Sequence, residues 1–248
     1  MIFPARIAGA LPPPPPDVEV ILTEGGVVWL LEGQGEAPAP VVFLFHGNGE
    51  NIASMLGIAR QYRSRGMAVA LVEYPGYGGT PGTPTQRSIT QASVAAYDMI
   101  TSRDDVDPRR VLVHGFSLGG AAAAQLANER RVDAMILEST FVSLVAMYRE
   151  MGLPGFLCRD PFRTDLVLES FEGPVLLVHG RRDEIVPFEH AVRLEAIASD
   201  GSLLAMDGNH NDGPSDVRAY WEAIDGLLGS MAGASSAAEP PRSGDGPR

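Results

Sequence analysis

Short apolar runs alternate with amphipathic segments of helical length along most of the chain. From Val41 onward the alternation is typical of a mainly parallel sheet whose strands are joined by crossover helices. The apolar runs are nearly continuous, which indicates strands that helices bury on both faces. The predicted strands are 41–45, 68–73, 111–116, 134–137, 174–178 and 202–206, and the predicted helices are 52–65, 85–103, 118–130, 188–198 and 214–229.

The two ends of the chain depart from this alternation. Residues 18–22 and 27–31 predict two strands joined by a turn at Gly25-Gly26, which indicates an antiparallel hairpin at the sheet edge. Before them, Pro12 to Pro16 predicts an extended segment, interpreted as a stiff lead-in on the surface, with an SH3-type ligand as the alternative. Residues 231–248 are rich in Ala, Ser, Pro and Gly without apolar periodicity, so a disordered tail is expected there.

One internal segment, residues 139–173, is too long for a simple connection between a strand and the next helix. We predict a small cap here, inserted into a single α/β domain that spans residues 1–230. The alternative is a helix that merely packs on the sheet. The apolar residues expected to cover a pocket beside Ser117 are Phe141, Leu144, Val145, Met147, Tyr148, Leu153, Phe156 and Leu157.

Composition narrows the possible partners and locations. The 248 residues are 45% hydrophobic and 20% charged with a formal net charge of −12, which disfavours binding to nucleic acid or to anionic lipid. The single cysteine, Cys158, excludes an intramolecular disulfide. No signal-peptide pattern and no apolar run near the ~20 residues of a membrane span is present. A cytoplasmic enzyme without stable membrane insertion is therefore expected, and the sequence does not determine its oligomeric state.

The stretch His114-Gly115-Phe116-Ser117-Leu118-Gly119-Gly120 carries the clearest chemical signal. It follows the apolar run 111–113 and precedes four alanines, so it predicts a strand, a sharp turn and a helix. Such a turn exposes the Ser117 hydroxyl at a helix N-terminus, where free N–H groups favour developing negative charge. Ser117 is therefore the candidate nucleophile for acyl transfer.

A serine nucleophile needs a histidine base and a carboxylate that orients it. Among five histidines, His210 lies in a polar loop after the last predicted strand, and we predict it to be the base. Asp183 follows the strand 174–178 and is predicted to be the acid, with Glu138 as its rival. The other histidines are expected to be structural: His46, His114 and His179 at strand ends, and His190 near a helix start.

An acyl-transfer site also needs donors for the oxyanion. One predicted donor is the backbone N–H of Leu118, directly after the nucleophile. The second is assigned to the N–H of Asn48 in the loop 46–51, with its neighbour Gly49 as the alternative. The same loop also fits an ordinary helix N-terminal turn without a ligand.

Together these motifs resemble the α/β-hydrolase superfamily over about residues 18–228. The matching motifs, in family order, are His46-Gly47-Asn48-Gly49, Tyr74-Pro75-Gly76-Tyr77-Gly78, Gly115-Phe116-Ser117-Leu118-Gly119-Gly120, His179-Gly180 to Asp183, and Gly208-Asn209-His210. Within it the chain is similar to the compact, small-cap branch of Bem46-like hydrolases and protein depalmitoylases. The resemblance implies an eight-stranded, mostly parallel sheet, a Ser117–His210–Asp183 triad, and no metal or organic cofactor. One departure is Arg181-Arg182, where many relatives carry smaller or less charged residues.

The expected function is that of a serine hydrolase that cleaves carboxylic esters or thioesters through an acyl-enzyme at Ser117. Its expected partner is a small-molecule or acylated substrate. A peptidase or an acyltransferase of the same fold would use the same residues. A non-catalytic ligand-binding module is the alternative from a different class, but it predicts a broken triad.

Overall fold

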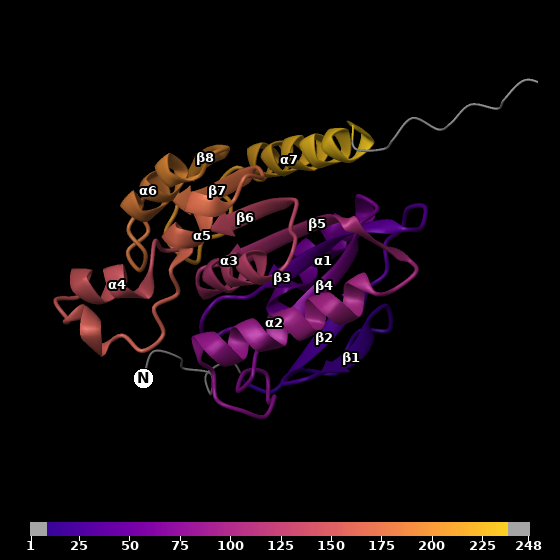
Figure 1. Cartoon of the computed structure of the whole chain (residues 1–248), viewed down its shortest axis with the longest axis horizontal. Helices are drawn as coiled ribbons and strands as arrows, with labels where there is room; N and C mark the ends of the chain where they lie inside the picture. The colour runs from indigo at the N-terminus through magenta and orange to yellow at the C-terminus, as the bar shows by residue number, and fades with distance from the viewer. Residues whose placement is uncertain (1–8, 238–248) are drawn as a thin grey trace, which may run out of the picture.

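A computed structural model describes residues 9–237, with side chains described for residues 9–231. Eight strands form one sheet in the order β1-β2-β4-β3-β5-β6-β7-β8 (Figure 1). The two N-terminal strands, β1 (Glu19–Thr23) and β2 (Gly26–Leu31), form the expected antiparallel edge hairpin, and β2 pairs antiparallel with β4 (Ala68–Glu73). All remaining pairs are parallel, which confirms the predicted fold class. The remaining strands are β3 (Ala39–Phe45), β5 (Val106–Phe116), β6 (Ala134–Glu138), β7 (Val175–Gly180) and β8 (Gly201–Met206).

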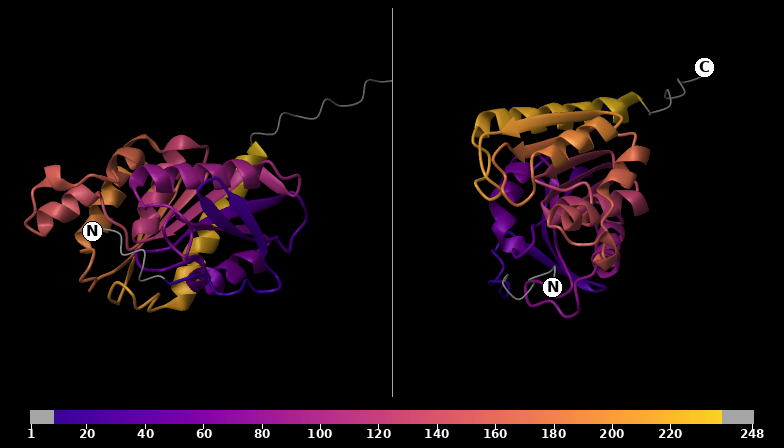
Figure 2. Two further views of the ribbon diagram at one scale, coloured as in Figure 1. Left: turned by 90° about the horizontal axis from the view of Figure 1, so that it is seen from below. Right: turned by 90° about the vertical axis from the view of Figure 1, so that its left-hand side faces the viewer.

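Helices cover both faces of the sheet, and each face has its own hydrophobic core. One core lies under α2 (Gln86–Thr101), α3 (Leu118–Glu129) and α6 (Glu189–Ile197). The other lies under α1 (Leu56–Ser64) and α7 (Val217–Ala237). Figure 2 shows α7 and α2 on opposite sides of the sheet. Within residues 9–237, no helix is both long and apolar enough to cross a bilayer.

The predicted cap divides into two parts. Helix α4 (Leu144–Glu150) and the short 3-10 turn η3 (Gly155–Leu157) lie at the edge of the molecule, beyond the sheet (Figure 1). Helix α5 (Thr164–Ser170) instead packs against α3 and α6, with Leu168 fully buried. The projecting part of residues 139–173 is therefore only the α4–η3 segment.

Several element boundaries differ from the predicted ones. Residues 52–65 break into the 3-10 turn η2 (Ile52–Met55) and α1. Helix α7 continues to Ala237, so the prediction of a disordered tail from residue 231 is wrong for residues 231–237. Met231 is buried in the second core, which fixes the helix at the point where the tail was expected to begin. The rest of the predicted tail, residues 238–248, lies outside the described residues.

Candidate active site

Ser117 occupies a strained turn between β5 and α3. Its backbone angles are φ 54° and ψ −115°, in a region that residues other than glycine rarely adopt. A Cβ atom at Gly115 would overlap the backbone of Gly119, and one at Gly119 would overlap the carbonyl of Phe45. Both neighbours of the turn therefore have to be glycine, as the sequence motif predicts.

Hydrogen bonds from the neighbouring strand hold this turn in place. The N–H of Ser117 donates to the carbonyl of Glu138 at 2.8 Å, and the Thr140 hydroxyl donates to the carbonyl of Ser117 at 2.7 Å. Thr140 is 1% exposed. The sequence carried no signal for its role, because the contact joins positions that are distant in the chain.

The predicted nucleophile, base and acid meet at the carboxyl edge of the sheet. His210 Nε2 lies 3.0 Å from Ser117 Oγ, and His210 Nδ1 lies 2.7 Å from Asp183 Oδ2. Because a carboxylate only accepts, Nδ1 carries the proton and Nε2 is left with the lone pair that faces the serine hydroxyl. All three residues are at most 8% exposed. The geometry is that of a serine, base and acid triad.

Several donors hold Asp183, and of these the sequence predicted only His210. Its Oδ1 accepts from the N–H groups of Ile185 at 2.9 Å and Val186 at 2.8 Å. His179 Nε2 lies 2.8 Å from the carbonyl of Val186 and 3.2 Å from Asp183 Oδ2, two acceptors that require a proton on this nitrogen. Burial alone would raise the pKa of Asp183, but the bonds from His179, His210 and Val186 outweigh it and lower the pKa well below its usual range. Asp183 therefore stays ionised.

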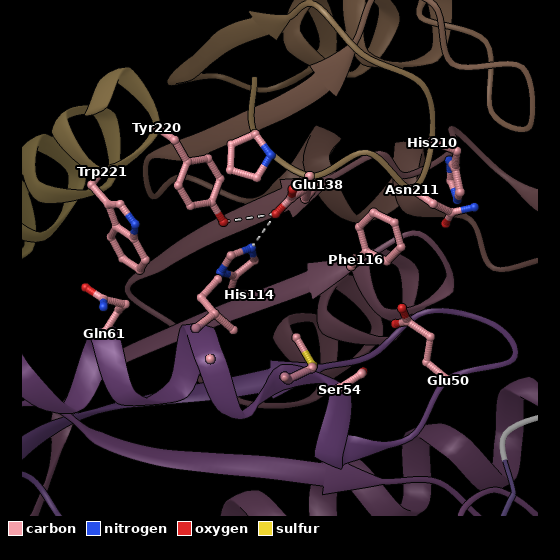
Figure 3. A pocket seen from close by; sticks show the side chains of 15 residues that line it. Glu50, Ser54, Gln61, His114, Phe116, Glu138, His210, Asn211, Tyr220 and Trp221 are labelled. Carbon is pink, nitrogen blue, oxygen red and sulfur yellow. Dashed lines mark hydrogen bonds and ion pairs between the residues drawn. The ribbon is translucent and has the colours of Figure 1, made fainter. Parts of the chain in front are cut away.

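Glu138, the rival acid, faces a different partner. Its Oε2 lies 3.2 Å from His114 Nε2 and accepts from the Tyr220 hydroxyl at 3.0 Å (Figure 3). The hydroxyl of Tyr62 in turn lies 2.9 Å from His114 Nδ1. Burial and the charge of Glu138 raise the pKa of both tyrosines, so both hydroxyls remain donors. The structure thus brings Asp183 to His210, and Glu138 to His114.

The loop of the predicted oxyanion donor is anchored by a buried contact between a histidine and a glutamate. His46 Nε2 lies 2.8 Å from Glu73 Oε1, and both side chains are fully buried. The other Glu73 oxygen accepts from the N–H of Ile52 at 3.1 Å. Glu73 is the last residue of β4 and directly precedes the Tyr74-Pro75-Gly76-Tyr77-Gly78 motif. This position beside a family motif is the sequence signal that could have identified Glu73 as an anchor of the loop.

Two tyrosines of that motif complete the anchoring. Tyr74 donates to the carbonyl of His46 at 2.9 Å, and Tyr77 donates to Asn48 Oδ1 at 2.6 Å. Burial, with the charge of Glu73, raises the pKa of Tyr77, so this hydroxyl stays a donor. Asn48 and Leu118 line the same pocket as Ser117, as their predicted role requires.

That pocket, here called the acyl pocket, has a volume of about 550 Å³. Its apolar wall comes largely from the cap segment, through Phe141, Leu144, Met147, Tyr148, Met151 and Leu153. The predicted cover residues Val145, Phe156 and Leu157 do not line it, and the side chain of Phe156 is 86% exposed. A pocket of this size, largely apolar and beside the serine, has the usual dimensions of a small-molecule site.

Arg181 and Arg182 point their charges away from the triad. Arg182 pairs with Asp207 at 3.0 Å, and the guanidinium of Arg181 lies 5.1 Å from the ring centre of Phe188. Neither arginine bonds Asp183. Among the described residues, no group of three His, Cys, Asp or Glu side chains is arranged to hold a metal ion.

Comparisons with known proteins agree with this architecture. Residues 40–164 match the family model described as alpha/beta hydrolase fold. The chain is 33% identical over 190 residues to the alpha/beta hydrolase domain-containing protein WAV2 of Arabidopsis thaliana, covering 69% of this chain and 62% of that protein. It is 30% identical over 167 residues to protein bem46 of Schizosaccharomyces pombe, covering 64% of this chain and 56% of that protein. The match therefore spans less than two thirds of the length of either relative.

A solved structure gives the same fold at lower sequence identity. The thermophilic esterase Est2 of Thermogutta terrifontis superposes with a TM-score of 0.68 at 18% identity, covering 94% of this chain and 98% of that chain. An identity this low supports the fold alone. Together with the strand order, the strained serine turn and the sequence relatives, the family match shows that the chain belongs to the α/β-hydrolase family, and its relatives there include bem46.

Proposed function

We propose that the protein is a serine hydrolase that cleaves carboxylic esters or thioesters through an acyl-enzyme. The observation that carries the proposal is the continuous hydrogen-bonded line from Ser117 Oγ through His210 to Asp183, beside an apolar pocket. The esterase title of the matched Thermogutta structure is consistent with this reaction class.

In the proposed first step, Ser117 Oγ attacks the carbonyl carbon while His210 Nε2 takes the hydroxyl proton. The backbone N–H groups of Asn48 and Leu118 are proposed to stabilise the oxyanion, each worth about 10²–10³ in rate. His210 then returns the proton to the departing alcohol or thiol, which leaves an ester of Ser117. Water attacks this ester by the same route, releasing the acid and restoring the serine.

The first test is replacement of the nucleophile. We expect Ser117→Ala to abolish p-nitrophenyl ester turnover and labelling by a fluorophosphonate probe, because within residues 9–231 no other hydroxyl hydrogen bonds His210. Turnover is measured by absorbance and labelling by in-gel fluorescence, with Ser215→Ala as the matched control, since Ser215 lies in the loop after β8 and bonds Asp207 N–H. Labelling that persists in Ser117→Ala would refute the proposal.

The acyl preference is tested by a series of esters and thioesters of graded length. Since the cap wall of the acyl pocket is apolar, we expect kcat/KM to rise with chain length until the pocket is full. The same series measured in the presence of alcohol acceptors distinguishes hydrolysis from acyl transfer.

A further inference from the structure

A second pocket, here called the rear pocket, adjoins the active site and has a volume of about 410 Å³. It shares Glu50, Phe116, His210 and Asn211 with the acyl pocket, and extends from them toward α1 and α7. Figure 3 shows His210, Asn211 and Glu50 at one end and Trp221 with Gln61 at the other, with Glu138 between them. Its size is sufficient for a ligand fragment.

The walls of the rear pocket are acidic. Two carboxylates, Glu50 and Glu138, line it, and none of its lining residues is a lysine or an arginine. Only one oxygen of the Glu138 carboxylate has hydrogen-bond partners among residues 9–231. His114 and Tyr220 both bond Oε2, and no group in that range hydrogen bonds Oε1. The side chain is 15% exposed. A carboxylate held in this way attracts a cation more strongly than one in bulk water.

Aromatic rings complete the wall around these carboxylates. Phe116, Tyr220 and Trp221 line the rear pocket, and aromatic faces attract cations. The indole of Trp221 already has one cationic neighbour, Arg65, whose guanidinium carbon lies 4.1 Å from the ring centre. Because Asp225 pairs with Arg65 at 2.6 Å, this arginine adds little net positive charge near the pocket.

We propose that the rear pocket binds a positively charged leaving group, such as an alkylammonium alcohol or thiol, while the acyl chain occupies the acyl pocket. The inference rests on the proposed function and adds the chemical class of the leaving group. In that reaction His210 protonates the departing oxygen or sulfur, so the leaving group has to lie against His210. The two pockets meet at that residue.

The test compares two esters of the same shape and different charge. Butyrylcholine carries a trimethylammonium group where 3,3-dimethylbutyl butyrate carries a neutral tert-butyl group. We expect wild-type kcat/KM to favour butyrylcholine by about tenfold or more, and Glu138→Gln to reduce this preference about tenfold. Trp221→Leu, which leaves the bonds of Glu138 in place, should reduce it as well.

The matched control is Glu222→Gln. It also removes one negative charge, but from an exposed side chain on α7 that pairs with Arg218. It should retain the wild-type ratio. Equal kcat/KM for the two esters in the wild type, or a ratio unchanged by both pocket variants, would overturn the inference while leaving ester hydrolysis established.

Binding of the leaving group can be measured without turnover, so it tests the rear pocket independently of the proposed hydrolase activity. In the Ser117→Ala background, calorimetric titration with choline and with 3,3-dimethylbutan-1-ol should show tighter binding of choline, and addition of Glu138→Gln should remove the difference. If neither these two esters nor p-nitrophenyl esters are turned over, the hydrolase proposal fails. Choline that then binds no tighter than the neutral alcohol would overturn the assignment of the rear pocket too.

Discussion

At the residue scale, the catalytic geometry depends on how firmly Asp183 is held. Four donors surround its carboxylate: two backbone N–H groups, His179 and His210. Only the bond to His210 takes part in the proposed reaction. The other three bonds fix the direction of the carboxylate. A carboxylate held toward Nδ1 keeps the proton on that nitrogen and so fixes the tautomer of His210.

Replacement of Asp183 tests this dependence. We expect Asp183→Asn to lower kcat by about 10³–10⁴-fold, because an amide that donates toward Nδ1 favours the wrong tautomer of His210. Steady-state kinetics on a p-nitrophenyl ester measure the effect, with the exposed neighbour Glu184→Gln as control. A loss of less than tenfold would contradict the role of Asp183 as the orienting acid.

The lowered pKa of Asp183 also predicts how stability changes with pH. A folded-state pKa below the unfolded value means that the carboxylate stabilises the fold above about pH 4, and that this contribution is lost as the pH falls toward the folded pKa. Urea unfolding of the wild type and Asp183→Asn from pH 6 to pH 3 should therefore show a difference in unfolding free energy that shrinks with falling pH. A constant difference would contradict the assignment.

Ser117, His210 and Asp183 were identifiable from the sequence because each follows a predicted strand, and parallel strands end at one edge of a sheet. The direction in which a side chain points at that edge could not be predicted from the sequence. Glu138 ends the neighbouring strand β6, and only the structure shows that it faces His114. Thr140 acts through a contact with Ser117, 23 residues away in the chain, which no local pattern encodes. His179 lies only four residues before Asp183, but the motif gives no sign that the two side chains meet.

At the element scale, the position of α4 depends on one buried histidine. His190 on α6 accepts from the N–H of Val142 at 3.1 Å through Nδ1, and its Nε2 lies 2.8 Å from Glu150 at the end of α4. His190 is 1% exposed. The wall of the acyl pocket is therefore tied to the body of the protein at both ends of α4.

Removal of this tie should loosen the wall. We expect His190→Ala to cost about 1–3 kcal/mol, since the buried N–H of Val142 loses its acceptor, and to raise KM for long acyl esters several-fold more than for acetate. Chemical denaturation and ester kinetics measure the two effects. Glu150→Gln, which still accepts from Nε2, should stay near the wild type; a uniform change in KM for all chain lengths in His190→Ala would argue against a role in the pocket wall.

Sequence patterns predicted some of the helices and missed the boundaries of others. Apart from the end of α7, the predicted helices that cover the sheet lie within a few residues of the observed ones, because burial on one face imposes a regular apolar spacing. The division of residues 139–173 into α4–η3 and α5 was not predicted, since both parts carry similar apolar residues. The end of α7 was missed because its final turns contain small residues without an apolar stripe.

At the scale of the whole molecule, the two cores share every central strand, so we expect them to unfold together. Leu126 on α3 belongs to one core and Ile224 on α7 to the other, and both are fully buried. Replacement of either by alanine should cost about 2–5 kcal/mol. Both tryptophans, Trp29 and Trp221, belong to or pack against the second core.

Urea unfolding with two probes checks this cooperativity. Leu126→Ala should shift the midpoint of tryptophan fluorescence as far as the midpoint of far-UV circular dichroism, although both tryptophans report on the opposite face. Separate midpoints for the two probes would show that the faces unfold independently. The exposed replacement Glu129→Gln on the same helix serves as control.

The walls of the two pockets come from different parts of the chain. Most of the acyl pocket wall is one contiguous insert between β6 and α5, whereas the rear pocket is built from η2, α1, α7, the strand ends and the loops that follow β3 and β8. Insertions and exchanges in a peripheral loop disturb a fold less than changes in its strands. Under the proposed assignment, exchange of the insert should therefore alter which acid the protein recognises, while recognition of the leaving alcohol or thiol stays with the body of the domain.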